Sequence, residues 1–277
     1  MRNPVVSGAF YPDNAESLKQ SIKDCFLSDF GPGKLPEKRE KSIKGVIVPH
    51  AGYVYSGPCA AYCYKEISES HSPDIFIILG LSHSGFPSCL SLEDWRTPLG
   101  TASVDKDFGK LLIENGILQD EQAHANEHSI EVQIPFLQFI LKDFKFVPII
   151  VSEDYKQVAG AILKALKQSN KKAVIIASSD FTHYGADYGF APFTEDIKEK
   201  MHKLDAGAIK QIKKLDAKGF LDYIDKTGAT ICGRYPIACL LECIKPAKAE
   251  LLKYYTSADI SKSDYSVSVG YAAILFS

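Results

Sequence analysis

The chain has 277 residues, of which 45% are hydrophobic and 24% are charged, and its formal net charge is -2. This composition is typical of a globular protein with a sizeable core. The near-neutral charge argues against a nucleic-acid-binding surface or a basic membrane-facing patch. No apolar run is long enough to span a bilayer, and residues 1–8 lack the apolar segment of a signal peptide. The seven cysteines show no disulfide framework, so we expect free thiols in a cytoplasmic protein.

The sequence pattern alternates between strands and helices along most of the chain. Short apolar runs, which predict strands buried on both faces, occur at 46–50, 74–80, 146–151 and 173–178. Helical patterns occur at 14–28, from about 58, and at 105–115, 129–142, 154–168, 191–226 (in two pieces) and 234–245. Two closing strand patterns, 251–257 and 266–276, are expected to form an antiparallel edge or hairpin.

This alternation predicts an α/β fold of three layers, in which a mostly parallel central sheet is flanked by helices on both faces. No repeat, low-complexity tract or linker-like shift in composition divides the chain, so we expect a single domain over residues 1–277. The basic stretch 34–44 is interleaved with glutamate and proline and is expected to be a solvated loop.

Three predicted strands end at or near a histidine. His50 ends the first strand, His83 follows the second, and His183 follows the 173–178 strand. Because ligands bind beyond the carboxyl ends of parallel strands, we expect the three imidazoles to meet at one edge of the sheet. Imidazole is a common metal ligand, which makes His50 and His83 the leading candidate ligands. The alternative is that both are polar loop residues bonded to the backbone.

Asp180 and His183 lie three residues apart and would share a face on the first turn of a helix. They could supply a third ligand, or a general base that Asp180 orients. Alternatively, Ser179 or Asp180 caps a helix. A helix cap would account for the serine and the aspartate but not for His183.

Two further segments carry candidate chemistry. Glu127-His128-Ser129 opens the predicted helix 129–142, so these residues either cap and pack that helix or place His128 in a pocket. Cys232 precedes the helix at 234–245, and a helix N-terminus tends to lower the pKa of a thiol, which favours a nucleophile or a metal ligand. The alternative is a buried structural cysteine.

These motifs resemble the Memo family (mediator of receptor-driven cell motility, and archaeal and bacterial relatives in the AmmeMemoRadiSam system). Six segments carry the resemblance in order: GAFYP at 8–12, VPHAGYVYSG at 48–57, GLSH at 80–83, EHSIE at 127–131, SSDFTHYG at 178–185 and CGRYP at 232–236. The family is similar in fold to the class III extradiol dioxygenases. Those enzymes hold Fe(II) with two histidines and a carboxylate and use another histidine for acid–base chemistry.

Carried over residue by residue, the resemblance implies that His50 and His83 are metal ligands. It places the acid–base histidine on His183, with Asp180 beside it, and puts Cys232 where the dioxygenases have a carboxylate. A soft thiolate at that position changes which metal the site prefers. The implied metal is iron, with copper or zinc as alternatives. Residues expected in the substrate pocket wall are Tyr53, Glu127 and His128.

Three functions stay open on this basis. The first is a redox or oxygenase-type metalloenzyme that acts on a small substrate, with His183 moving a proton. The second is a catalytically silent binding module that recognises a peptide or phosphopeptide in the inherited cleft. The absence of the carboxylate ligand favours this second function. The third uses Cys232 as a covalent nucleophile and His183 as its base. The expected partner is a small molecule or a peptide, with neither nucleic acid nor membrane, and the sequence does not give the oligomeric state.

Overall fold

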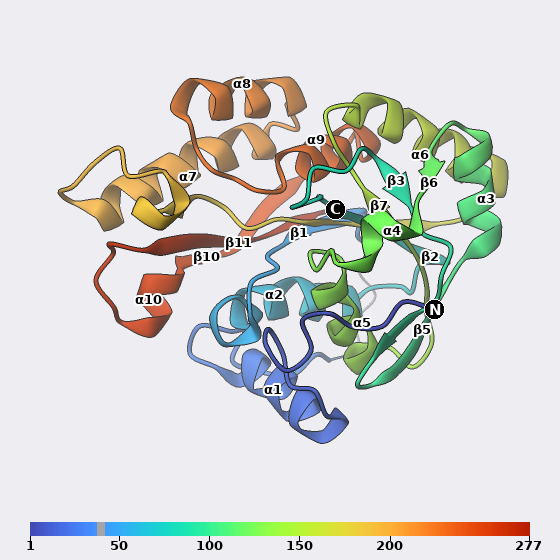
Figure 1. Cartoon of the computed structure of the whole chain (residues 1–277), viewed down its shortest axis with the longest axis horizontal. Helices are drawn as coiled ribbons and strands as arrows, with labels where there is room; N and C mark the ends of the chain where they lie inside the picture. The colour runs from blue at the N-terminus through green and yellow to red at the C-terminus, as the bar shows by residue number, and fades with distance from the viewer. Residues whose placement is uncertain (38–41) are drawn as a thin grey trace.

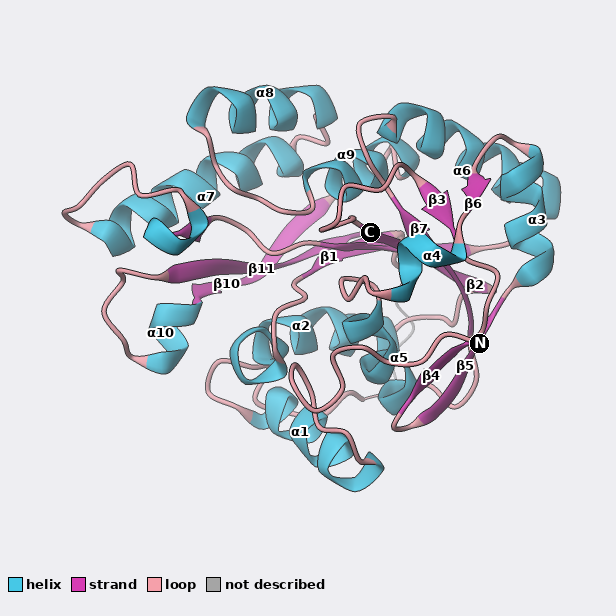
Figure 2. Ribbon diagram, in the orientation of Figure 1, coloured by secondary structure: helices cyan, strands magenta, loops and turns pink. Residues whose placement is uncertain are grey.

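A large mixed β-sheet runs through the middle of the protein and is covered by helices on both faces, as the computed structural model in Figures 1 and 2 shows. The structure describes residues 1–37 and 42–277, so the loop expected at 34–44 includes residues 38–41 that lie outside the described part. No helix in these two ranges combines the length and hydrophobicity needed to cross a bilayer.

The four apolar runs of the sequence form the parallel centre of the sheet. They are β1 (Gly45–Val48), β2 (Ile75–Gly80), β7 (Lys145–Ile150) and β8 (Ala173–Ser178), in the spatial order β1-β8-β2-β7. Nearly every residue in these strands is buried, as expected for strands with helices above and below. Successive side chains of these strands pack alternately into two hydrophobic cores. Ile47 points into one core, whereas Val46 and Val48 point into the other.

Outside these central strands the sheet is mixed instead of mostly parallel, because antiparallel pairs occur beside further parallel pairs. β11 (Ser268–Phe276) pairs antiparallel with β1 on one side and with β10 (Ala249–Thr256) on the other, so β10 forms the edge. The remaining strands are β3 (Cys89–Leu90), which is antiparallel to β7, the hairpin β4 (Trp95–Thr97) and β5 (Gly100–Val104), β6 (Leu118–Gln119) and β9 (His183–Tyr184). The pairs β3–β6 and β5–β7 are parallel. Among the described strands, only β4 and β5 are joined by a tight turn, which antiparallel pairing allows.

Two groups of helices bury the faces of the sheet (Figure 1). One face carries α1 (Ala15–Leu27), α2 (Tyr53–Ser68) and α5 (Ile134–Ile140). The other carries α3 (Lys106–Glu114), α6 (Tyr155–Ser169), α7 (Ile197–Lys213), α8 (Ala217–Thr227) and α9 (Arg234–Cys243). Two short helices, α4 (Glu121–Ala125) and α10 (Ser257–Ser261), complete the described fold.

Two helices differ from the sequence pattern in ways that shape the site. α2 begins at Tyr53, directly after Gly52, so Pro58 lies inside the helix instead of starting it. α5 covers only 134–140 of the predicted 129–142, after a 3-10 turn at Glu131–Gln133. The chain at 127–130 is irregular because its polar groups bond to the loop that follows β2.

Candidate metal centre

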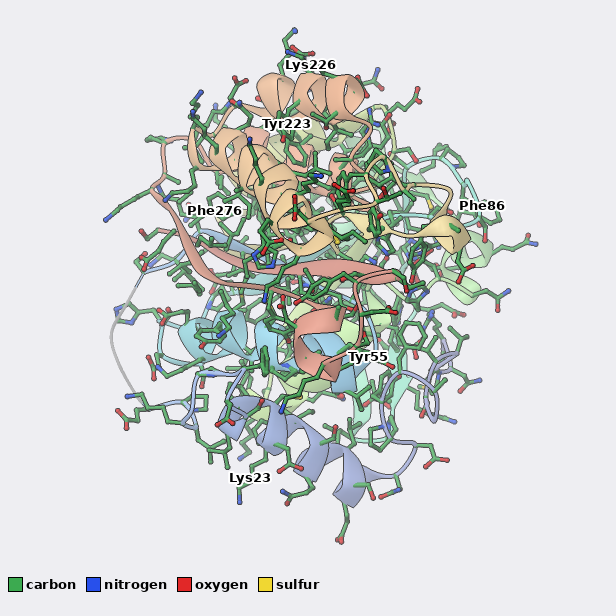
Figure 3. The ribbon with its side chains drawn as sticks, turned by 90° about the vertical axis from the view of Figure 1, so that its left-hand side faces the viewer. Lys23, Tyr55, Phe86, Tyr223, Lys226 and Phe276 are labelled. Carbon is green, nitrogen blue, oxygen red and sulfur yellow. The ribbon has the colours of Figure 1, made fainter. Side chains whose placement is uncertain are left out.

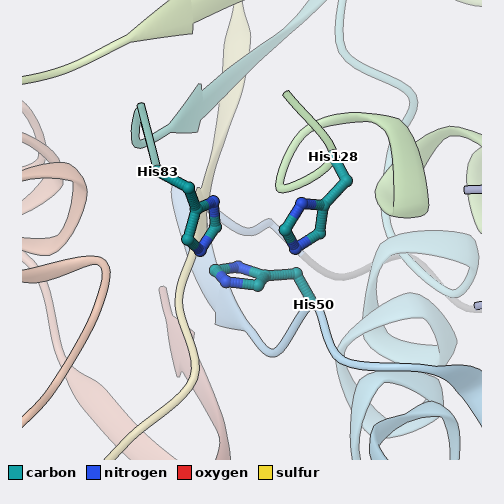
Figure 4. A group of neighbouring side chains, drawn as sticks. All are labelled: His50, His83 and His128. Carbon is teal, nitrogen blue, oxygen red and sulfur yellow. The ribbon is translucent and has the colours of Figure 1, made fainter. Parts of the chain in front are cut away.

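Three histidines converge at the carboxyl ends of the central strands (Figure 4). His50 follows β1, His83 follows β2, and His128 comes from the irregular segment before the 3-10 turn. One ligand nitrogen from each lies within 4.8 Å of the others. The rings of His83 and His128 stack with centroids 4.5 Å apart, and each centroid lies 5.7 Å from that of His50. The structure thus brings His128, expected only as a pocket wall, next to the two predicted ligands.

A buried hydrogen-bond chain fixes the tautomer of His50. The Ser178 hydroxyl donates to the carbonyl of Ser129 at 2.6 Å and accepts from the Gln133 side-chain amide at 2.9 Å. His50 Nδ1 lies 2.9 Å from the same hydroxyl. Because the only proton of Ser178 is already committed, Nδ1 must be the donor. His50 Nε2 is therefore unprotonated and can offer its lone pair to a ligand, as a metal site requires.

Glu127 holds His83 in the same way. His83 Nδ1 lies 3.0 Å from Glu127 Oε1, while the backbone N–H groups of His83 and Ser129 each donate to the carboxylate at 2.8 Å. Burial alone would raise the pKa of Glu127, but these bonds outweigh it and lower the pKa, so the carboxylate stays ionised. Glu127 thus binds the Nδ1 side of the imidazole, and His83 Nε2 can bind a ligand.

The protonation preferences of the three histidines differ. Burial, and then the neighbouring imidazoles, holds the pKa of His50 well below its ordinary value, and burial followed by His83 lowers the pKa of His128. Burial also opposes the charged form of His83, yet the bond to Glu127 prevails and raises the pKa of this residue. His50 and His128 are thus held as neutral rings at pH 7, which is the form that binds a metal.

Cys232 and Asp180 also contact His50. The sulfur of Cys232 is 3.3 Å from His50 Nε2 and accepts the backbone N–H of Asp180 at 3.3 Å. Asp180 Oδ1 in turn accepts the backbone N–H of His50 at 2.8 Å. Gly233 permits this approach, since a Cβ there would lie 2.6 Å from the carbonyl oxygen of Ser178.

The pKa of Cys232 runs against the sequence-based expectation. The residue does precede α9, but burial, and then the charge of Asp180, raises the pKa of its thiol instead of lowering it. Without a cation beside it, the sulfur is a neutral thiol at pH 7. This works against a nucleophilic role, whereas a metal ion would displace the proton.

His183 is positioned by strand pairing and not by a helix. It opens β9, where it is the partner of Val269 in β11, so the shared helical face considered for Asp180 and His183 does not form. Its Nδ1 lies 3.0 Å from the carbonyl of Phe181 and 3.2 Å from that of Thr230. Both oxygens can only accept, so Nδ1 carries the proton and Nε2 is an acceptor available for proton transfer.

A cavity of about 320 Å³ lies over these groups and is lined by His50, His83, His128, Asp180 and His183. Of the other predicted residues, Cys232 lines a neighbouring cavity of about 560 Å³. Tyr53 is buried in the core, where its hydroxyl donates to the carbonyl of Val132.

Sequence reasoning missed three residues that shape the site. Ser178 and Gln133 orient His50, and the ring of Phe10 packs edge-on against His128 with centroids 4.9 Å apart. Ser178 ends a strand beside the candidate residues, which is a signal that could have found it. Gln133 gives no such signal, because its partners come from distant segments.

Comparison with known proteins identifies relatives over the full length. The family model described as "Memo-like protein" matches residues 2–275. A MEMO1 family protein of Methanopyrus kandleri is 40% identical over 290 residues, covering 99% of this chain and 98% of its own. MEMO1 family proteins of Methanobrevibacter smithii and Methanococcus vannielii are 39% and 42% identical, and the alignments cover at least 99% of both partners.

Proposed function

The chain belongs to the Memo-like protein family, and we propose that it binds a transition-metal ion through His50 and His83, with His128 and Cys232 completing the donor set. The observation that carries this proposal is the orientation of the two imidazoles. Each Nδ1–H is held by a buried acceptor, Ser178 for His50 and Glu127 for His83, so both Nε2 atoms are unprotonated and can act as ligands. Histidine ligands are generally oriented by such partners.

The donor set limits the choice of metal. Imidazole nitrogens suit iron, copper and zinc, whereas a thiolate adds preference for softer ions, and hard-oxygen metals such as Mg²⁺ and Ca²⁺ are disfavoured. We propose iron as the resident metal, with copper and zinc as alternatives. Metal content measured after purification without chelators distinguishes them.

We further propose that the site is that of a redox or oxygenase-type enzyme acting on a small substrate, with a fold shared with the class III extradiol dioxygenases. A bound metal would supply Lewis-acid or redox chemistry. His183 would accept or return a proton at Nε2, and the volume of about 320 Å³ limits the substrate to a small molecule or one side chain. Asp180, whose pKa is raised by burial, would hold the loop that carries His50.

The test compares two histidine variants. We expect the wild-type protein to bind about one equivalent of Zn²⁺ or Fe²⁺ by titration calorimetry and elemental analysis, and His50→Ala to lose it, because a site with few protein ligands depends on each of them. His71→Ala, at an exposed histidine outside the cavity, is the matched control. One equivalent retained by His50→Ala would refute the proposed site.

A binding module remains the second candidate, and one observation favours it. Val54, Tyr55 and Tyr188 line the cavity mouth with exposed fractions of 73%, 45% and 43%, which suits contact with a peptide. Oxygen consumption or substrate turnover by metal-loaded protein would support the enzyme. Saturable peptide binding at the cavity without turnover would support the module.

A further inference from the structure

A second cavity, of about 650 Å³, lies between α7 and the edge strand β10, on the side of the protein that faces the viewer in Figure 3. It shares no lining residue with the cavity over the histidines. Its apolar wall includes Ala206 and Ile209 of α7 and Leu251 of β10. The cavity therefore offers an apolar contact surface that is independent of the proposed metal centre.

Three lysines of α7 line the same cavity: Lys210, Lys213 and Lys214. All three are exposed, and within the described part of the chain no carboxylate lies within 4.0 Å of their amines. The first turn of the same helix differs, since Lys198 pairs with Asp259 at 2.8 Å and Lys200 lies 3.9 Å from Asp196. The charge around the cavity is thus uncompensated, whereas the charge at the start of the helix is balanced.

The other polar side chains of the lining already have hydrogen-bond partners. The Tyr254 hydroxyl donates to Asp205 at 2.6 Å, and His202 Nε2 lies 3.3 Å from Asp259. The hydrogen-bond donors that a ligand meets are therefore mainly the lysine amines, of which Lys214 has only a long bond of 3.4 Å to Gln211. A ligand that matches both the lysine amines and the apolar wall needs an anionic group at one end and an apolar body at the other.

We propose that this cavity binds a small anionic amphiphile: a carboxylate, sulfonate or phosphate ester whose chain or ring lies on Ala206, Ile209 and Leu251. Its anionic group meets the three lysines. The volume lies within the range of small-molecule sites. An inorganic anion would leave the apolar wall unused, and a neutral apolar molecule would leave the lysine charges unmatched.

The test uses 8-anilinonaphthalene-1-sulfonate as a fluorescent probe, with dodecyl phosphate and inorganic phosphate as competitors. We expect saturable binding that weakens with added salt and that dodecyl phosphate displaces and inorganic phosphate does not. The variant K210Q/K213Q/K214Q should bind the probe about tenfold more weakly, because it removes three partly screened charges. Ala206→Phe, which fills the cavity from an exposed helix position, should abolish competition by dodecyl phosphate while keeping the charge.

The matched control is K156Q/K164Q/K167Q, which removes the same charge from exposed positions of α6. Equal weakening by the control, or unchanged binding in Ala206→Phe, would overturn the proposal. So would binding to anionic phospholipid vesicles that the lysines support and Ala206→Phe leaves intact, because a membrane surface does not need the cavity. All variants should keep the Zn²⁺ stoichiometry and melting temperature of the wild type, so failure here is distinguishable from failure of the metal site.

Discussion

Replacing Glu127 by Gln tests whether this residue positions a metal ligand or only supports the fold. The carboxylate accepts the ring N–H of His83 and two backbone N–H groups. An amide can accept through one oxygen only and must turn its NH₂ toward one of these donors. Loss of such a partner typically costs 10–100-fold in metal affinity, or about 1.4–2.7 kcal/mol. We expect that range for Zn²⁺ binding at pH 7.5.

The pH profile separates the two roles. In the wild type Glu127 raises the pKa of His83, so a proton competes with the metal for Nε2 as the pH falls below that raised value. In the variant burial prevails and the pKa of His83 falls, so competition begins only at lower pH. The affinity ratio of wild type to variant should therefore be largest at high pH and should shrink as the pH falls.

The assay is competition of Zn²⁺ between the protein and a chromophoric chelator from pH 5.5 to 8.0. Glu121→Gln is the control, because Glu121 also accepts a backbone N–H, that of Leu92 at 2.8 Å, but lies outside the site. Parallel pH profiles for the wild type and Glu127→Gln would refute the positioning role. Equal affinity at pH 7.5 would refute it as well.

Three further changes test other parts of the structure. His183→Ala should keep the affinity for Zn²⁺ within about threefold of the wild type while abolishing any turnover, because the proposed role of His183 is proton transfer. Loss of Zn²⁺ binding would show instead that His183 is a metal ligand. Burial raises the pKa of Asp205 from 3.8 to about 6, so its folded carboxyl holds a proton more tightly than the unfolded one. Relative to Asp205→Asn, the free energy of unfolding of the wild type in urea should thus fall by about 2.4 kcal/mol between pH 4 and pH 7, and a pH-independent difference would contradict this cause. Arg2→Met removes the cation that lies 2.8 Å from the buried Glu131 carboxylate and should lower the free energy of unfolding by about 3–5 kcal/mol. A loss below about 1 kcal/mol would show that the ion pair contributes little.

The sequence predicted the parts of the fold that depend on local pattern. The four apolar runs became the parallel centre of the sheet, and the closing pair β10 and β11 is antiparallel as expected. The hairpin of β4 and β5 and the strands β3 and β6 were missed. They are two to five residues long, so too few residues carry the pattern.

The site was predictable only in part, for a similar reason. His50 and His83 stand directly after strong strand patterns, and the structure places both in the histidine cluster. His128 lies in a segment that resembled a helix, because the Ile130 and Ile134 spacing is helical. Its irregular backbone depends on Glu127 and Ser129 bonding to residues more than 40 positions earlier, which no local pattern reveals.

The place of β1 in the sheet determines when the site can form during synthesis. Val46 pairs with Ile176 on one side and with Leu275 on the other, and Cys232 meets His50 across 182 positions of sequence. Such distant pairings close late in folding, because a long loop must be ordered before any contact repays that entropy. A nascent chain that has exposed His50 and His83 therefore still lacks β8, α9 and β11. His50 therefore reaches its native surroundings only after these later segments have been synthesised and have packed against β1.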